Sequence, residues 1–231
     1  MTASVAMHLS DGVLDAPTSL LFGAVAVTWL TVAAARGRID IDDRTAPLAG
    51  LLAAFLFAMQ LLNFPVLPGV SGHLYGGALA AILLGPWVGA LCLSVVVAIQ
   101  ALLFADGGLT ALGANVTNMA LLGTAVGFAV ALAARGLARR SRTGLLAVAF
   151  LAGLVSTVAA AAGFVVEYAI GGQADVSLGG LAGVVIGVHA VIGIGEGVIT
   201  ALAVGAIAKV RPDLIYLVRT SEARQPVEVT S

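Results

Sequence analysis

The chain of 231 residues has little charge and few aromatic side chains: 10% of its residues are Asp, Glu, Lys or Arg, and 6% are Phe, Trp or Tyr. About a quarter of the residues of an ordinary soluble domain are charged, so soluble and disordered classes are excluded. The hydrophobic share of 60% therefore indicates a membrane protein. A net charge of −1 gives no reason to expect a nucleic-acid partner.

Other patterns are missing too. Short alternating segments with aromatic girdles, typical of a membrane β-barrel, do not occur. Residues 1–16 lack a basic start followed by an apolar stretch and a cleavage site, so no signal peptide is predicted. The single Cys92 cannot form an intramolecular disulfide. The 29 glycines and abundant alanines favour closely packed helices, because small residues let helix backbones approach in lipid.

The apolar runs predict an all-α, polytopic helix bundle. A helix needs about 20 apolar residues to cross the hydrocarbon core, and the pair Gly85-Pro86 divides one run that is too long for a single span. Seven helices are expected, over residues 17–35, 47–62, 76–84, 87–104, 114–134, 145–170 and 181–208.

The basic residues predict an orientation. They form three clusters: Arg36, Arg38 and Arg44; Arg135, Arg139, Arg140 and Arg142; and Lys209, Arg211, Arg219 and Arg224. With seven spans, all eleven basic residues fall on one side of the membrane. The positive-inside rule makes that side cytoplasmic, so we expect the N-terminus outside and the C-terminus in the cytoplasm.

Motifs for enzymatic chemistry are missing as well. The sequence has no Walker-type phosphate loop, so this chain is not expected to power transport with ATP. It also has no His-Glu-x-x-His pair and no Gly-x-Ser-x-Gly elbow, which argues against a membrane protease or esterase. We expect a protein that is not an enzyme.

Two of the three histidines are candidate metal ligands. With the predicted topology, His8 and His73 lie on the same outer face, and imidazole suits Ni, Co, Cu and Zn. A chain that started at Met7 would offer its free amine, the His8 amide nitrogen and His8 Nδ1, which close five- and six-membered chelate rings. His73 would add a fourth nitrogen. Four nitrogens in a plane suit Ni(II) or Cu(II), whereas Zn(II) prefers a tetrahedron.

The residues Met1–Ala6 in front of Met7 would turn this amine into an amide. Either the start codon was assigned too early, or the segment is removed, or the chelate does not form; we expect the first. We therefore expect 1–16 to be an extension and metal-binding segment, 17–210 the helix bundle and 211–231 a cytoplasmic tail.

Polar residues within or near the spans are candidate supports for this site. His189 and Glu196 lie seven residues apart on one helix face and are the ionisable residues that we expect deep within spans. They could serve as a latch, or Glu196 could simply be satisfied by a neighbouring helix. Asn115 is expected near a helix start, where capping is its ordinary role. The set of possible supporting residues is Asn63, Ser71, Asn115, His189 and Glu196.

At this point the sequence resembles the CbiM/NikM family, the metal-specific substrate-binding (S) components of energy-coupling factor transporters. The stretches that carry the resemblance are Met7-His8-Leu9-Ser10-Asp11-Gly12, Asn63-Phe64-Pro65 through Ser71-Gly72-His73-Leu74 to Gly85-Pro86-Trp87, Gln100 through Asp106-Gly107-Gly108 to Asn115, and His189 through Gly193-Ile194-Gly195-Glu196 to Thr200. They span nearly the whole chain in family order.

The resemblance implies a seven-helix fold that captures metal on the outside of a bacterial or archaeal plasma membrane, through the residues matching Met7, His8 and His73. It implies a transmembrane coupling (T) subunit, ABC-type ATPases and often a small accessory membrane protein as partners. The transported Ni²⁺ or Co²⁺ is then the substrate, and no resident cofactor is expected. We expect nickel ahead of cobalt. The alternative is a stand-alone secondary carrier or channel for a divalent cation or small solute.

Overall fold

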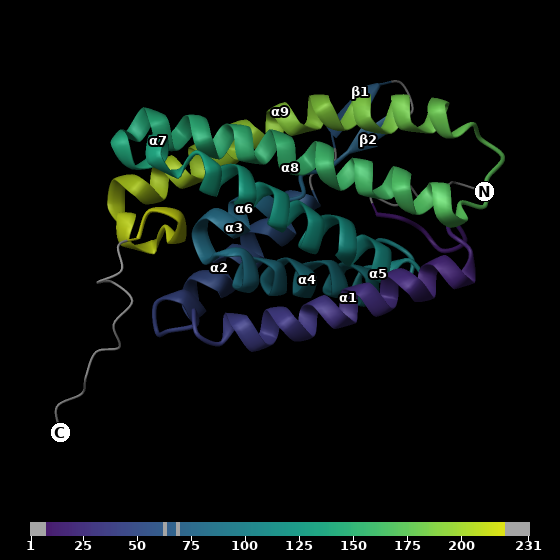
Figure 1. The fold of residues 1–231 in the computed structure, drawn as a ribbon, viewed down its shortest axis with the longest axis horizontal. Coiled ribbons are helices and arrows are strands. Elements are labelled where there is room, and N and C mark those ends of the chain that lie inside the picture. Colours follow the sequence, from purple (N-terminus) through teal and green to yellow (C-terminus); the bar gives the residue numbers. More distant parts are fainter. Residues whose placement is uncertain (1–7, 62–63, 68–69, 220–231) are drawn as a thin grey trace.

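The structure is a computed structural model that describes residues 8–61, 64–67 and 70–219. Long helices run side by side along one axis (Figure 1), and the beginning of the first helix and the end of the last lie at opposite ends of the bundle. This arrangement confirms the predicted helix bundle.

The described elements follow in chain order. They are α1 (Ala16–Gly37), α2 (Thr45–Gln60), β1 (Phe64–Leu67), β2 (Val70–Gly72), α3 (Gly77–Leu84), α4 (Pro86–Leu103), α5 (Leu112–Asn115), the π-helix η1 (Val116–Gly123), α6 (Thr124–Ala133), α7 (Arg135–Arg140), α8 (Arg142–Gly171), α9 (Leu178–Val210) and the 3₁₀ turns η2 (Pro212–Leu214) and η3 (Tyr216–Val218). α5, η1 and α6 form one continuous helix, Leu112–Ala133.

Each of the seven expected segments contains a helix. Among the described residues, five helices are long and apolar enough to cross a membrane, namely α1, α4, the helix Leu112–Ala133, α8 and α9. α2 has 16 residues and α3 only 8, so both are shorter than a usual span. The chain is a multi-pass membrane protein, while the count of seven crossings and the orientation stay predictions.

The break at Gly85-Pro86 is where the sequence predicted it. Gly85 has φ of 84° and ψ of 168°, and a Cβ there would lie 2.8 Å from the ring of Tyr216. Only glycine fits both conditions, and Pro86 then opens α4 without a lost hydrogen bond. All eight residues of α3 are buried, so α3 is a half-helix enclosed by the bundle. Its irregular ends avoid lipid because protein surrounds them.

A short hairpin adds two strands to the bundle. β1 and β2 pair antiparallel, with Phe64 opposite Gly72 and Pro65 opposite Ser71, in a segment that lies between two of the expected helices. The hairpin packs beside α9 (Figure 1). It delivers His73 and Tyr75 to the start of α3.

α8 and α9 pack closely along their length. Gly193 and Gly197 of α9 are spaced as a Gly-x-x-x-Gly pair and face α8, where a Cβ at Gly197 would lie 2.6 Å from the carbonyl oxygen of Phe150. A Cβ at Gly153 of α8 would lie 2.9 Å from the Gly197 Cα. The two backbones therefore touch through small residues, as helices in lipid commonly do.

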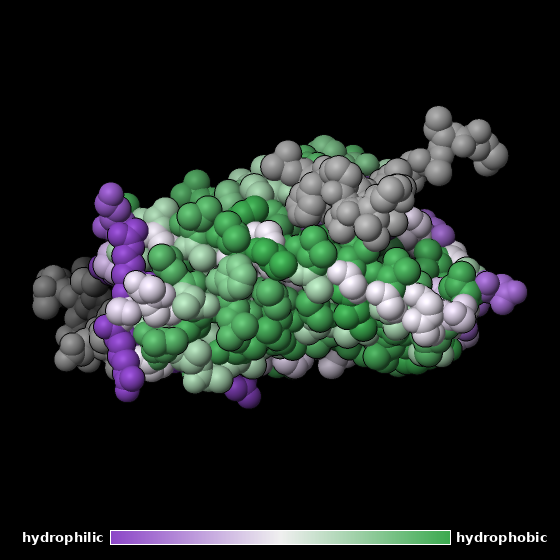
Figure 2. Space-filling view, turned by 90° about the horizontal axis from the view of Figure 1, so that it is seen from above, coloured by the Kyte–Doolittle hydropathy of each residue, from purple (hydrophilic) through white to green (hydrophobic). Residues whose placement is uncertain are grey.

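The polar residues gather at the two ends of the bundle. Figure 2 shows hydrophilic residues mostly at the ends and a hydrophobic surface between them. At the end opposite the start of α1, Arg135 Nε donates to the Leu217 carbonyl at 2.6 Å, Arg139 donates to the Arg219 carbonyl at 3.1 Å, and Arg44 lies 3.9 Å from Asp213. The three expected basic clusters therefore meet at one end of the described chain.

The close packing of α8 against α9 leads to a prediction about the stability of the folded protein. Gly197→Ala should destabilise the folded protein by about 1–3 kcal/mol, because the new methyl group meets the α8 backbone. Gly195→Ala is the matched control, since a Cβ there meets nothing within 4 Å and alanine is the better helix former. Thermal melting in detergent checks both variants, and equal melting temperatures would contradict the prediction.

Candidate metal site

Residues 8–14, here called the N-terminal strap, are held against two loops of the bundle. Near its end, the strap pairs with the segment after α8: Gln173 N–H donates to the Val13 carbonyl at 3.0 Å, and Asp15 N–H donates to the Gly171 carbonyl at 2.7 Å. The Asp15 carboxylate accepts from Thr18 N–H at 2.8 Å and caps α1. Hydrogen bonds from the side chain and then the backbone of Thr18 lower the pKa of Asp15. The end of the strap and the start of α1 are thereby fixed.

The beginning of the strap is clamped by Asn115. The Asn115 Oδ1 accepts from Leu9 N–H at 3.0 Å, and its Nδ2 donates to the Leu9 carbonyl at 3.1 Å. Gly108 N–H donates to the same carbonyl at 2.8 Å. Capping was therefore the wrong role for Asn115: it ends α5 inside a continuous helix, and its side chain makes no cap hydrogen bond.

The loop Asp106–Thr110 fits under the strap because it contains Gly107-Gly108. Gly107 has φ of 96°, and a Cβ there would lie 2.8 Å from the His8 Cβ. A Cβ at Gly108 would run into Asp11. Asp11 also accepts from the hydroxyl and the N–H of Thr110, at 2.6 and 2.8 Å, and these bonds lower its pKa.

The structure brings His8 and His73 together. Their ring centroids are 4.7 Å apart with an angle of 46° between the planes, and both side chains are buried, at 7% and 3% exposure. His73 Nδ1 lies 2.9 Å from the Leu74 carbonyl. Because a carbonyl only accepts, Nδ1 carries the proton and the neutral ring keeps its lone pair on Nε2. His8 Nδ1 lies 3.3 Å from Asp106 Oδ1.

A cavity of about 290 Å³ opens beside these two rings. A liquid water molecule takes up about 30 Å³, so a metal ion could enter with part of its hydration shell. The polar residues in the wall are His8, Ser10, His73, Tyr75, Asn115, Asn118 and His189. The three histidines of the chain, from three distant parts of the sequence, thus line one cavity.

Two residues of α9 that the sequence analysis singled out, His189 and Glu196, bind the part of the cavity wall that contains Tyr75. His189 Nε2 lies 2.7 Å from the Tyr75 hydroxyl. The buried Glu196 carboxylate accepts from Tyr75 N–H at 2.8 Å and Gly76 N–H at 2.7 Å, at the start of α3. Glu196 is therefore satisfied by backbone N–H groups at the start of the neighbouring helix α3, beside the cavity. Burial raises the pKa of Tyr75, which keeps its hydroxyl protonated.

The side chains of three predicted site residues lie outside the described part of the structure. Met7 and Asn63 lie outside the described residues. Ser71 lies in β2, paired with Pro65, and only its backbone is described. The ligand set proposed from the sequence is therefore represented in the structure by His8 and His73.

Sequence reasoning missed three participants. Asp106 and Tyr75 were not among the predicted site residues, although the Asp106 carboxylate lies beside His8 and the Tyr75 hydroxyl contacts His189. Glu167 of α8 was missed as a buried ionisable residue, so it was wrong to expect only His189 and Glu196 within the helices. Its Oε2 accepts from Asn118 Nδ2 at 2.7 Å. An intramembrane carboxylate is itself a signal of function.

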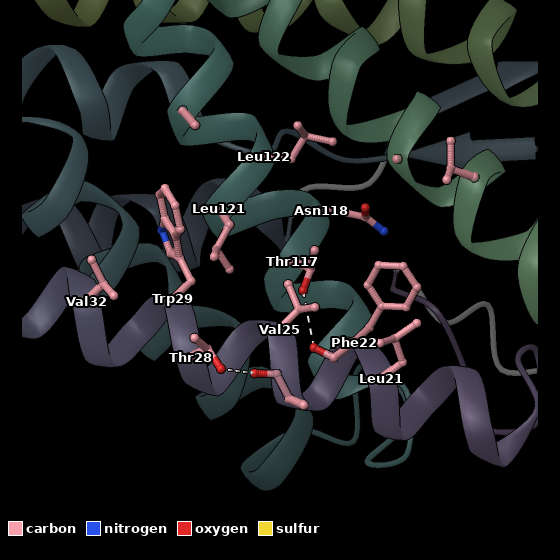
Figure 3. Close-up of a pocket in the computed structure, with 14 residues that line it drawn as sticks. Leu21, Phe22, Val25, Thr28, Trp29, Val32, Thr117, Asn118, Leu121 and Leu122 are labelled. Atoms are coloured by element: carbon pink, nitrogen blue, oxygen red, sulfur yellow. Dashed lines mark hydrogen bonds between the residues drawn. The ribbon is translucent and has the colours of Figure 1, made fainter.

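Asn118 also borders a second hollow, of about 720 Å³, between α1, η1 and α8. Figure 3 shows Asn118 among apolar side chains that include Phe22, Val25 and Trp29. The hydroxyl groups there are internally bonded, since Thr28 donates to the Ala24 carbonyl at 2.7 Å and Thr117 to the Phe22 carbonyl at 3.4 Å. This hollow lacks metal-binding side chains, so the smaller cavity is the candidate metal site.

Protein side chains alone do not complete a metal site in this state. Over the part of the chain that the structure describes, no three His, Cys, Asp or Glu residues lie close enough to hold one ion. The two neighbouring imidazoles would need further donors, such as backbone nitrogens.

Comparisons with known proteins find relatives among metal transport proteins. A curated relative from Archaeoglobus fulgidus, described as a putative fused nickel transport protein NikMN, is 45% identical over 155 residues, covering 67% of this chain and 50% of the relative. The cobalt transport protein CbiM of Sorangium cellulosum is 39% identical over 168 residues, covering 71% and 73%. Against several such relatives, this chain spans only about half of their length.

The fold has solved counterparts. A crystal structure described as a transition metal transporter has a TM-score of 0.78 and 32% identity, covering 88% of this chain and 93% of that one. The family described as the cobalt uptake substrate-specific transmembrane region, CbiM, matches residues 8–214. The match extends from His8 through the last helix, so the chain belongs to the CbiM family.

Proposed function

We propose that this protein captures Ni(II) or Co(II) at the outer face of the cell membrane, as the substrate-binding subunit of an energy-coupling factor importer. The observation that carries the proposal is the pairing of His8 with His73 at 4.7 Å, beside a cavity that opens between them and α9. Relatives described as nickel and cobalt transport proteins support the choice of metals.

The proposed ligand set is completed by backbone nitrogens. The clamp of Asn115 on Leu9 fixes the peptide bond between His8 and Leu9, so the backbone directly after the His8 ring is held in one place. With a free amine on Met7, the amine, the His8 amide and His8 Nδ1 give three nitrogens, and His73 gives the fourth. Asp106, beside His8 Nδ1, adds negative charge near a cation. A planar nitrogen set favours Ni(II), so nickel is proposed ahead of cobalt.

The charge distribution supports an outward-facing site. The described basic residues of the helix ends gather at the end of the bundle opposite the start of α1, and the N-terminal strap leads directly into α1. The positive-inside rule places the basic end in the cytoplasm. Metal would then enter from outside and leave toward the basic end.

Partners would have to supply the energy. The sequence has no ATP-binding loop, so the proposal includes a transmembrane coupling subunit, ABC-type ATPases and a small accessory membrane protein. Metal uptake that stops when the ATPases are removed would support the importer. Full uptake by this chain alone would instead favour a stand-alone carrier.

The first prediction concerns the histidine pair. His73→Ala and His8→Ala should each weaken Ni(II) binding by more than tenfold, because each removes a nitrogen ligand. Isothermal titration of the purified full chain measures this, with Ser94→Ala as control, since Ser94 is not in the lining of the cavity and its hydroxyl donates to the Ala90 carbonyl in its own helix. Unchanged affinity in either histidine variant would remove that histidine from the ligand set.

The second prediction concerns the residue before His8. A chain that begins at Met7 should bind Ni(II) at least tenfold more tightly than a chain that keeps Met1–Ala6, because only the first has a free amine beside His8. Mass spectrometry of the N-terminus, together with metal analysis, identifies the two forms. If the chain beginning at Met1 binds Ni(II) equally well, and His8→Ala leaves that binding unchanged, the chelate is ruled out.

A further inference from the structure

The proposed chelate leaves one histidine of the cavity unused. His189 comes from α9 and lines the same cavity as His8 and His73. Its ring is joined to the pair through Tyr75: the ring centroids of His73 and Tyr75 are 5.3 Å apart, and those of Tyr75 and His189 are 5.5 Å apart. Four aromatic rings thus form a row from the strap to α9, with an imidazole at both ends.

The hydrogen bonds of His189 fix which nitrogen can bind metal. His189 Nδ1 lies 2.7 Å from the Val185 carbonyl, one turn earlier in α9. A carbonyl has no proton to give, so Nδ1 is the donor, and the neutral ring carries its lone pair on Nε2. Nε2 lies 2.7 Å from the Tyr75 hydroxyl, which therefore donates to it. This orientation, with one nitrogen bonded to a backbone carbonyl, is the one that metal-binding histidines commonly adopt.

Tyr75, whose hydroxyl occupies the Nε2 position of this ring, belongs to the segment that carries His73. Its backbone N–H is held by Glu196, so its position depends on how α9 lies against the start of α3. A shift of this segment would withdraw the hydroxyl and uncover the Nε2 lone pair. The exchange of a hydroxyl for a metal ion at Nε2 moves no proton from the ring.

We propose that His189 is a second metal station of the cavity, whose Nε2 takes the Ni(II) or Co(II) ion after it leaves His8 and His73, when the Tyr75 hydroxyl moves away. This inference rests on the proposed function. One imidazole with water ligands binds more weakly than a four-nitrogen chelate, and weak successive sites are what a transported ion needs in order to leave again.

The first experiment removes the capture site. In the full chain with His8→Ala and His73→Ala, NiCl₂ binding is measured by equilibrium dialysis. Residual binding is expected, and adding His189→Gln should weaken it at least tenfold. Adding Tyr75→Phe instead should strengthen it at least threefold, because the ring stays while the competing hydroxyl is lost. No residual binding, or residual binding that His189→Gln leaves unchanged, overturns the proposal.

The second experiment keeps the capture site and follows transport. His189→Gln in the otherwise native chain should slow Ni(II) uptake by cells at least tenfold. Gln can still accept from Tyr75 but is a poor metal ligand, whereas His189→Cys supplies a thiolate and should restore part of the uptake. Uptake at the wild-type rate with Gln, or no better uptake with Cys than with Gln, overturns the station.

The proposed function and the second metal station are refuted by different results. A native chain that binds neither Ni(II) nor Co(II), or binds them without His8 and His73, refutes the proposed function. A native chain that binds metal through His8 and His73, while His189→Gln changes neither residual binding nor uptake, refutes only the second station. Melting temperatures of all variants show that each one folds.

Discussion

Two hydrogen bonds between the Asn115 side chain and the backbone N–H and carbonyl of Leu9 hold the N-terminal strap against the bundle. His8 precedes Leu9 directly, so the clamp helps to keep its ring beside that of His73, more than sixty residues later in the sequence. Each bond of this kind contributes about 0.5–1.5 kcal/mol. The bonds at Gly108, Gly171 and Gln173 add to the clamp, and together they replace the regular secondary structure that the strap lacks.

Most of the fold could be predicted from the sequence because lipid imposes simple rules. Apolar runs of sufficient length mark the helices, and Gly85-Pro86 marks the end of α3, where φ is positive and the next residue opens a new helix. The hairpin could not be predicted in this way. β1 and β2 are four and three residues long, and their segment is rich in Gly and Pro, so neither periodicity nor propensity identified them.

The site was predictable in part. His8 and His73 could be chosen because imidazoles are few in this chain and the predicted topology places both on one face. The role of Asn115 could not, because an asparagine near a helix start has an ordinary local explanation, while its actual partner is 106 residues away. Glu167 was overlooked because it lies only a few residues from the end of α8, where a carboxylate usually reaches water. The structure instead buries it against Asn118.

The two contacts that α9 makes with the start of α3 have a mechanical consequence. His189 and Glu196 are two helical turns apart, about 10 Å along the axis, and they hold the side chain and the backbone of the same residue, Tyr75. A segment held by one contact can rotate about it. A segment held by two contacts must move with the helix or lose one of those contacts. Any tilt of α9, with α8 packed tightly along it, would therefore change the shape of the cavity that the three histidines line.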